Sequence, residues 1–235
     1  MRNLIIASTS TIHGSGYLDY ILNDLNLFFK NANIILFVPY ARPNGISHDE
    51  YTEKANTAFS KINKSVIGIH TFKNPIDAIK NAEAIFIGGG NTFVLTNQLY
   101  KNNLIDPIKT AIKKGTPYLG TSAGSNICGL TIKTTNDMPI VYPPSFNALA
   151  FVPFNINPHY LDPDTNSTHM GETRATRINE FHNFNTPPVI GLREGSWLKI
   201  HGDSIILKGE LTARIFEYNN APYEINPETE LNHLK

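Results

Sequence analysis

Short, unbroken apolar runs alternate with amphipathic segments through the first two-thirds of the chain, and this alternation constrains the fold most strongly. Continuous apolar runs of strand length are typical of strands covered on both faces of a sheet. A β–α–β–α order predicts a parallel sheet with helices on both faces. The expected strands are Leu4–Ala7, Ile34–Val38, Val66–His70, Ala84–Ile87 and Pro117–Gly120, and the expected helices are Tyr17–Lys30, Ser47–Ile62, Asn91–Tyr100 and Leu104–Lys114.

The pattern changes after Gly129. Residues 131–170 are rich in Pro, Asn, Thr and Asp, so we expect a long irregular region of the kind that often carries function. A helix is expected over Glu172–Phe184, and the polar tail from Asn219 is expected to be irregular. Short strands are expected at Val189–Leu192, Trp197–Ile200, Ser204–Leu207 and Arg214–Phe216, with Gly202-Asp203 as a hairpin turn.

Length and composition favour one domain. The chain has 235 residues, of which 41% are hydrophobic, which is enough for a sizeable core but short for two full domains. We therefore expect residues 1–235 to form a single α/β domain. Its core should be a single doubly wound, mostly parallel sheet.

Charge and cysteine content limit the partners and the compartment. The 20 basic and 20 acidic residues cancel, and no basic block stands out, which argues against nucleic acid as a main partner. Cys128 is the only cysteine, so no internal disulfide can form, as is typical of a reducing compartment. The apolar run Leu4–Ala7 is too short for a signal peptide or a membrane span. We expect a cytoplasmic protein that binds neither nucleic acid nor membrane.

A glycine-flanked serine is the first candidate for chemistry. The segment 120–124 (GTSAG) has the spacing Gly-x-Ser-x-Gly, follows an expected strand and precedes the helix-compatible stretch Ser125–Leu130. This order is the setting of a nucleophile elbow, in which the serine projects from a strained turn and flanking glycines let the turn close. The pattern predicts Ser122 as the nucleophile of a serine hydrolase. The alternative is a Gly/Ser-rich connection without chemistry.

Three glycines, Gly88–Gly90, end another expected strand. They expose backbone N–H groups at the carboxyl edge of the sheet, where ligands of α/β proteins bind. We expect Gly89 and Gly90 to form an oxyanion hole together with the amide of Ala123. A phosphate site is the rival, although the segment matches neither nucleotide-binding fingerprint. A tight turn that caps the next helix is the remaining alternative.

A serine hydroxyl needs a base and, behind the base, an orienting acid. His159 and His169 both lie in the long irregular region, and a preceding proline and apolar stretch favour His159. Either could instead be an ordinary loop histidine. Asp137 and Glu194 are the alternatives for the acid, and each could instead be a turn residue. The histidines lack metal-ligand spacing, so we expect no metal and no cofactor.

Six short segments of the chain form a specific set when they are taken together. In chain order they are Ile87–Phe93 (IGGGNTF), Gly120–Asn126 (GTSAGSN), Thr134–Ile140 (TTNDMPI), Ile156–His159 (INPH), Gly171–Arg174 (GETR) and Gly191–Gly195 (GLREG). They span most of the chain from about residue 85 to 200 and are far more specific than the serine turn alone. Through these segments the chain resembles the peptidase E family of cytoplasmic α-aspartyl dipeptidases.

The resemblance implies a hydrolytic domain related in fold to the class I glutamine amidotransferases, with serine in place of their elbow cysteine. It implies a small peptide substrate, a dipeptide with an N-terminal aspartate (Asp-Xaa). It assigns the nucleophile to Ser122 and the base to His159. For the third member it offers Asp137, the position usually written into the family's charge relay, and Glu194.

An N-terminal aspartate presents a β-carboxylate and an α-ammonium, so its site should hold a fixed cation. Arg174 and Arg177 share a face of an expected helix, and we hypothesise that Arg174 binds the β-carboxylate. Glu172 or Asp137 could hold the ammonium. The alternative is a solvated helix start, with Glu172 favourable to the helix dipole.

Rival functions remain open on the sequence. A cyanophycinase-like hydrolase would share the serine turn but cleave a β-aspartyl–arginine polymer. A lipase-type esterase would need an exposed apolar lid, and none is evident. A non-catalytic binding or sensor module on the same fold is the third alternative. The sequence also leaves a monomer and a homodimer equally open.

Overall fold

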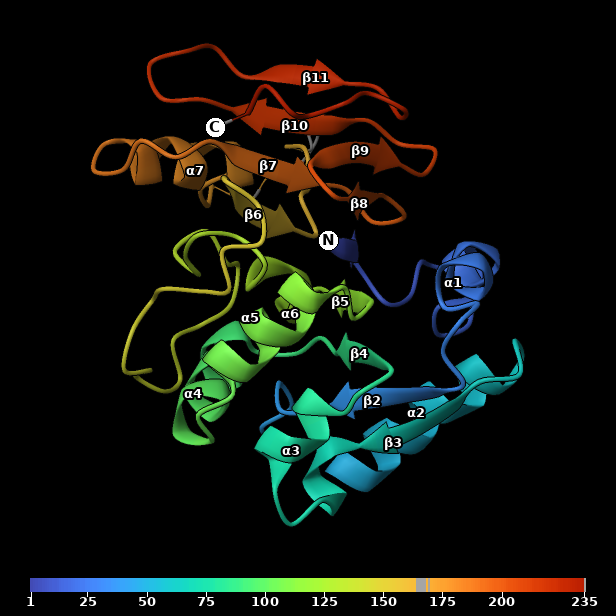
Figure 1. Ribbon diagram of the computed structural model, residues 1–235. Coiled ribbons are helices and arrows are strands. Elements are labelled where there is room, and N and C mark those ends of the chain that lie inside the picture. Colours follow the sequence, from blue (N-terminus) through green and yellow to red (C-terminus); the bar gives the residue numbers. More distant parts are fainter. Residues whose placement is uncertain (164–167, 169, 235) are drawn as a thin grey trace.

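The computed structural model describes residues 1–163, 168 and 170–234 (Figure 1). Its centre is a seven-stranded sheet with the strand order β3-β2-β4-β5-β1-β8-β9. β1 to β5 run parallel, and β8 and β9 extend the sheet in antiparallel fashion next to β1. The strands are β1 (Asn3–Ala7), β2 (Ile34–Val38), β3 (Ser65–Gly68), β4 (Ala84–Ile87), β5 (Tyr118–Thr121), β8 (Trp197–His201) and β9 (Ser204–Lys208).

Helices cover both faces of this sheet, as the alternating pattern predicted. Successive residues of β1 point to opposite faces, so Ile5 packs in one core cluster with Leu25 and Phe59, whereas Ile6 packs in the other with Ile108. The first face carries α1 (Leu22–Phe28) and α2 (His48–Ser60). The second carries α3 (Pro75–Lys80), α4 (Thr92–Lys101), α5 (Ile105–Lys114) and α6 (Ala123–Asn126).

The expectation of a single sheet is wrong. A four-stranded sheet with the order β11-β10-β7-β6 lies beside the central one (Figure 1). Its apolar side joins the same core cluster as α4 and α5, while α7 (Arg174–His182) packs on its other side through Ile178. The strands are β6 (Asn155–Pro158), β7 (Val189–Leu192), β10 (Ala213–Phe216) and β11 (Tyr223–Ile225).

β6 and β11 fall in regions that the sequence marked as irregular. β6 is buried although it contains two asparagines, because the preceding loop bonds the side chains of Asn155 and Asn157 through most of their polar atoms. The Asn155 side-chain oxygen accepts a hydrogen bond from the Thr131 N–H at 2.8 Å, and the Asn157 amide donates to the Thr134 carbonyl at 2.8 Å. A buried strand whose polar groups are bonded by a loop lacks the apolar pattern by which strands are recognised.

Several boundaries also differ from the expectations. Leu18 has φ 62°, a left-handed conformation, so no helix runs through it and α1 is shorter than expected. β3 stops at Gly68 and a 3-10 turn, Ile69–Thr71, follows it. α3 was not predicted, although Asn74 caps it. α6 occupies 123–126 instead of 125–130.

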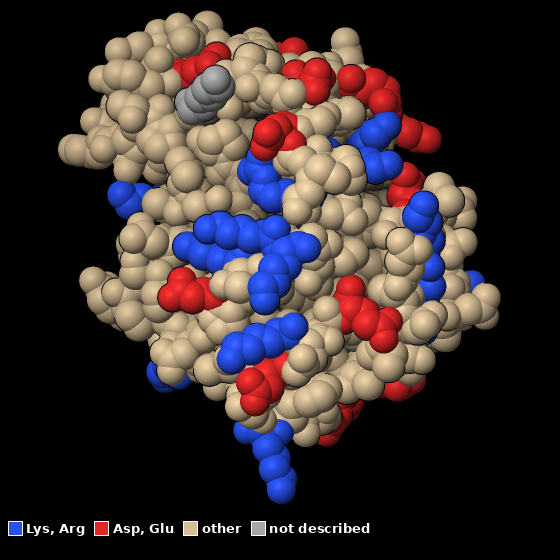
Figure 2. All heavy atoms as spheres, in the orientation of Figure 1, with Lys and Arg blue, Asp and Glu red and all other residues tan. Residues whose placement is uncertain are grey.

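The charged surface is mixed. On the face drawn in Figure 2, acidic and basic side chains are interspersed, with one group of basic side chains near the middle, where α5 lies in Figure 1. α5 ends in Lys113 and Lys114, which suit the negative end of its dipole. Among the helices of the described residues, none is both long and apolar enough to cross a membrane.

Candidate active site

Ser122 occupies the turn between β5 and α6. Its backbone angles, φ 53° and ψ −111°, lie outside the regions that non-glycine residues ordinarily adopt. Close packing fixes this turn. A Cβ on Gly124 would overlap the Ile87 carbonyl, and one on Gly120 would overlap the Gly124 carbonyl. The Ser125 hydroxyl ties the turn to the sheet, since it lies 2.6 Å from the carbonyl oxygen of Ala7.

His159 directly follows β6 and faces Ser122. Its Nε2 lies 2.9 Å from Ser122 Oγ, and its Nδ1 lies 2.6 Å from Glu194 Oε1. His159 also has a strained backbone, with φ 53°. The three side chains therefore form a continuous hydrogen-bonded chain from serine to histidine to carboxylate, assembled from three loops that are far apart in the sequence.

Ser8 is a residue that sequence reasoning missed. Its hydroxyl accepts a hydrogen bond from the His159 N–H at 2.8 Å and donates to the Leu192 carbonyl at 2.7 Å. It thereby joins the end of β1 to the residue after β6 and the last residue of β7. The only signal in the sequence is its position directly after an apolar strand, at the edge where α/β proteins place their sites.

Asp137, the other carboxylate considered for this role, bonds elsewhere. Its Oδ2 accepts a hydrogen bond from the Thr92 N–H at 2.7 Å, at the start of α4, and one from the Thr135 hydroxyl at 3.1 Å. A carboxylate at a helix N-terminus is stabilised by the helix dipole. Within the described ranges, the acid that reaches His159 is Glu194 and not Asp137.

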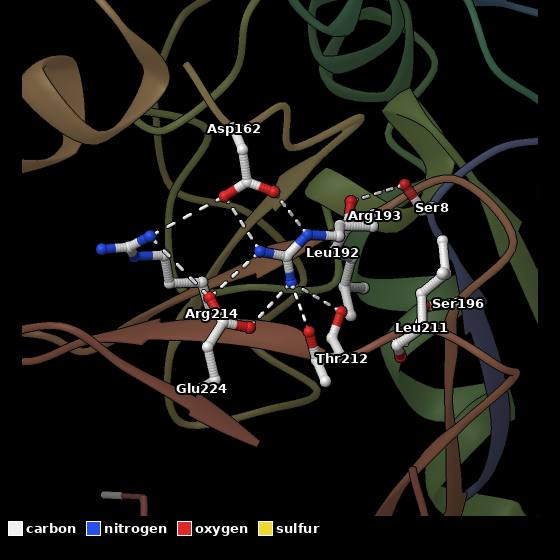
Figure 3. Close-up of polar contacts among 9 residues, drawn as sticks. All are labelled: Ser8, Asp162, Leu192, Arg193, Ser196, Leu211, Thr212, Arg214 and Glu224. Carbon is white, nitrogen blue, oxygen red and sulfur yellow. Dashed lines mark hydrogen bonds and ion pairs between the residues drawn. The ribbon is translucent and has the colours of Figure 1, made fainter. Parts of the chain in front are cut away.

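Arg193, next to Glu194, anchors this corner of the site (Figure 3). Its guanidinium binds Asp162 through two hydrogen bonds of 2.8 and 2.9 Å, and Glu224 through two of 2.8 and 3.0 Å. It also donates to the Thr212 carbonyl and hydroxyl, at 2.9 and 2.8 Å. Since Asp162 follows His159 by three residues, Arg193 links the two loops that carry His159 and Glu194.

Arg193 shifts the pKa values of its two carboxylate partners. Hydrogen bonds from Arg193 hold the pKa of the Asp162 carboxyl and that of the Glu224 carboxyl below their usual range, against the opposing effect of partial burial. Arg214 adds weaker ion pairs to the same two carboxylates, at 3.7 and 3.8 Å. The cluster is therefore a network of two cations and two anions.

The glycine loop lies against Ser122. A Cβ on Gly89 would come within 2.9 Å of Ser122 Cβ, so the loop backbone passes directly beside the serine. The Tyr51 hydroxyl donates to the Gly89 carbonyl at 3.1 Å and fixes that peptide. Gly90, with φ 144°, packs on the Ala41 carbonyl. Asn91 caps α4, as the turn alternative also expected.

The arginines of α7 differ in their pairing. Thr173 caps the helix, so Glu172 precedes it instead of lying on it as expected, and the Arg177 Nε lies 3.7 Å from Glu172 Oε2. No carboxylate of the described residues lies within ion-pair distance of Arg174. Burial and the charge of Arg177 lower the pKa of Arg174, while the nearby Asp137 carboxylate opposes that shift. Arg174 and Asp137 thus lie within electrostatic reach of one another.

Two expectations remain, one for His169 and one for a metal site. His169, the second candidate for the base, lies outside the described residues. Among the described residues, no group of three or more His, Cys, Asp or Glu side chains is arranged to hold a metal ion. The chemistry that this arrangement can perform is transfer of a proton from the Ser122 hydroxyl to an imidazole that a carboxylate orients.

Comparison with solved structures defines the class of fold. The protein is similar to a putative peptidase E protein from Listeria monocytogenes EGD-e, with a TM-score of 0.68 and 23% identity over 89% of this chain and 98% of that one. It is also similar to a peptidase from an acI-B1 Actinobacterium, with a TM-score of 0.73 and 14% identity over 98% and 96% of the chains. At these identities the likeness establishes the fold alone, a mixed α/β protein with a mostly parallel central sheet.

Sequence relatives narrow that class to a family. Residues 4–208 match the profile of Peptidase family S51. A probable alpha-aspartyl dipeptidase from Drosophila melanogaster is 47% identical over 99% of this chain and 97% of the relative. A peptidase E from Streptomyces coelicolor is 46% identical over 99% and 94%. The chain belongs to peptidase family S51, which confirms the resemblance read from its motifs.

Proposed function

We propose that the protein is a serine-type dipeptidase that hydrolyses dipeptides with an N-terminal aspartate through an acyl-enzyme on Ser122. Family membership supports a peptidase, and the names of the two relatives support the Asp-Xaa substrate. The observation that carries the mechanism is the chain of contacts at His159, 2.9 Å to Ser122 Oγ and 2.6 Å to Glu194 Oε1.

In the proposed reaction His159 takes the hydroxyl proton of Ser122 while Ser122 Oγ attacks the peptide carbonyl carbon. The amides of Ala123 and of the loop 88–90 stabilise the oxyanion, and Gly89 is the loop residue that packs on Ser122. His159 then gives its proton to the leaving amine, and water attacks the acyl-enzyme to release aspartate. Glu194 holds the imidazole in the tautomer whose Nε2 can accept the Ser122 proton.

We further propose that the turn at Ser122 is a nucleophile elbow and that the fold is related to the class I glutamine amidotransferases. The strained angles of Ser122, its place between β5 and α6, and the two tightly packed glycines support the elbow. Residues 1–235 would act as one hydrolytic domain. The unpaired, buried Cys128 agrees with a cytoplasmic site of action.

Arg174 is the proposed ligand of the substrate's β-carboxylate. It has no ion pair among the described residues, whereas Arg177 already lies near Glu172. Asp137, within electrostatic reach of Arg174, is the proposed ligand of the α-ammonium. This assignment gives Asp137 a part in substrate binding and leaves the orientation of His159 to Glu194.

A substrate panel on the wild type and on Ser122→Ala tests the proposal. The wild type should hydrolyse Asp-Leu and other Asp-Xaa dipeptides, and Ser122→Ala should lose about 10⁴-fold or more of kcat because the acyl-enzyme cannot form. Ser60→Ala, which removes an exposed hydroxyl at the end of α2, is the matched control for the loss of a hydroxyl. Turnover of β-Asp-Arg in place of Asp-Leu would support the cyanophycinase-like alternative, and ester turnover alone would support an esterase.

A further inference from the structure

A small cavity without an assigned role opens beside the glycine loop, on the α2 face of the central sheet. Its volume is about 210 Å³, enough for a carboxylate and part of a side chain. None of the residues that line it is acidic. They are Arg42, Asn44, Gly45, Ile46, Tyr51 and Lys54.

Two cations of this cavity are held by aromatic rings and not by carboxylates. The Arg42 guanidinium carbon lies 5.3 Å from the centre of the Tyr51 ring, and the Lys54 amino group lies 5.2 Å from the centre of the Tyr17 ring. Over residues 1–163, 168 and 170–234, neither cation has a carboxylate within ion-pair distance. Lys61, the residue directly after the helix that carries Lys54, is instead paired with Asp19.

A buried hydroxyl next to these cations also lacks a partner. Tyr17 is only 9% exposed, and its hydroxyl has no hydrogen-bond partner among the described residues. Burial raises the pKa of this hydroxyl well above its usual range, and the positive charge of Arg42 opposes that rise, so the two groups lie within electrostatic reach.

The cavity is linked to the proposed catalytic serine through Tyr51 and the glycine loop. Tyr51, which lines it, donates to the Gly89 carbonyl, and Gly89 packs on Ser122. Asp137, in contrast, binds the start of α4, which covers the opposite face of the central sheet. Two arginines therefore lie near elements that adjoin Ser122, with Arg174 near Asp137 and Arg42 over the Tyr51 ring.

We propose that Arg42, with Lys54, binds the α-carboxylate of the second residue of the dipeptide, and this inference rests on the proposed function. In a dipeptide that carboxylate lies one residue beyond the scissile bond, and each added residue moves it by up to about 3.3–3.6 Å. A cation that binds this carboxylate therefore selects substrates by length. Arginine suits this role because its planar fork binds both carboxylate oxygens.

Steady-state kinetics on Asp-Leu and on Asp-Leu amide, which lacks the carboxylate charge, test this inference. The wild type should prefer Asp-Leu by about 10- to 100-fold in kcat/KM, the range expected for one charge-assisted hydrogen-bonded pair. Arg42→Met should remove most of this preference by raising KM for Asp-Leu, and Arg42→Lys should restore part of it. Lys101→Met, which removes an exposed positive charge from α4, is the matched control and should keep the full preference.

Turnover of the amide reports folding and catalysis independently of the carboxylate. Equal turnover of acid and amide by the wild type would overturn the inference and leave the proposed function standing. So would an Arg42→Met variant that loses acid and amide turnover to the same extent. Failure of the wild type to cleave any Asp-Xaa substrate would instead overturn the proposed function, and the inference with it.

Discussion

Glu194 and Asp137 fit the sequence equally well as the acid behind His159, yet the fold surrounds them with different partners. Glu194 follows Arg193, whose guanidinium is bound by Asp162, Glu224 and Thr212. Asp137 lies in a loop that caps α4, near an arginine without an ion pair among the described residues. Paired charges thus fix the region that orients His159. In the other region Arg174 has no ion pair among the described residues, as the binding of a charged substrate requires.

The largest expected difference between these regions is in kcat, when each carboxylate is replaced in turn by its amide. Glu194→Gln removes the charge that orients His159 and favours the wrong tautomer, so kcat for Asp-Leu should fall by about 10³- to 10⁴-fold with little change in KM. Asp137→Asn should lower kcat less than about tenfold and act mainly through KM. Steady-state kinetics on both variants, with circular dichroism to verify folding, measure this. A larger loss of kcat in Asp137→Asn would exchange the two assignments.

A smaller difference, in kcat/KM, is expected between variants of the two arginines of α7. Arg174→Met removes the proposed ligand of the β-carboxylate, so kcat/KM for Asp-Leu should fall about 10- to 100-fold, as expected for one charge-assisted bond. Arg177→Met is the matched control, because Arg177 already lies beside Glu172 and its loss should cost less than about threefold. Equal losses in both variants would mean that the positive charge of the helix start, and not Arg174, attracts the substrate.

The central sheet could be predicted because its strands are buried on both faces. Ala84–Ile87 and Leu4–Ala7 are apolar throughout, and the structure places them in β4 and β1. The start of α2 was predicted at Ser47, and Ser47 does cap this helix: its hydroxyl accepts a hydrogen bond from the Glu50 N–H, and the Glu50 carboxylate accepts one from the Ser47 N–H. Such local patterns depend only on neighbours in the chain.

The strands β7 and β10 of the second sheet were expected, but their place in a separate sheet could not be predicted, because its buried strand β6 depends on distant partners. Asn155 and Asn157 are bonded by a loop more than twenty residues earlier, and only the folded chain brings these groups together. The same holds for the acid behind His159. Both Asp137 and Glu194 fit the sequence, and the contact with Glu194 depends on strand pairing between β6 and β7. Ser8 gave no signal beyond its place after a strand.

The anchor Arg193 itself should have a measurable effect on the stability of the fold. Arg193→Met leaves Asp162 and Glu224 without their main cation and the Thr212 carbonyl without a donor, so the free energy of unfolding near pH 7 should fall by about 1–3 kcal/mol. Arg214→Met, which removes only the longer ion pairs of the same cluster, should cost less. Thermal unfolding of both variants at equal protein concentration provides the comparison.

At low pH, most of the difference in stability between Arg193→Met and the wild type should disappear. Arg193 lowers the pKa of the Asp162 and Glu224 carboxyls in the folded protein, so these groups stabilise the fold above their unfolded pKa of about 4, and that contribution is lost as the pH falls through the folded values. The gap in Tm should therefore be full near pH 6 and narrow towards pH 3. Arg193 also lies over the Tyr160 ring, 5.5 Å from its centre, and donates to Thr212, so a gap that persists at pH 3 would assign the stabilisation to these uncharged contacts and not to charge pairing.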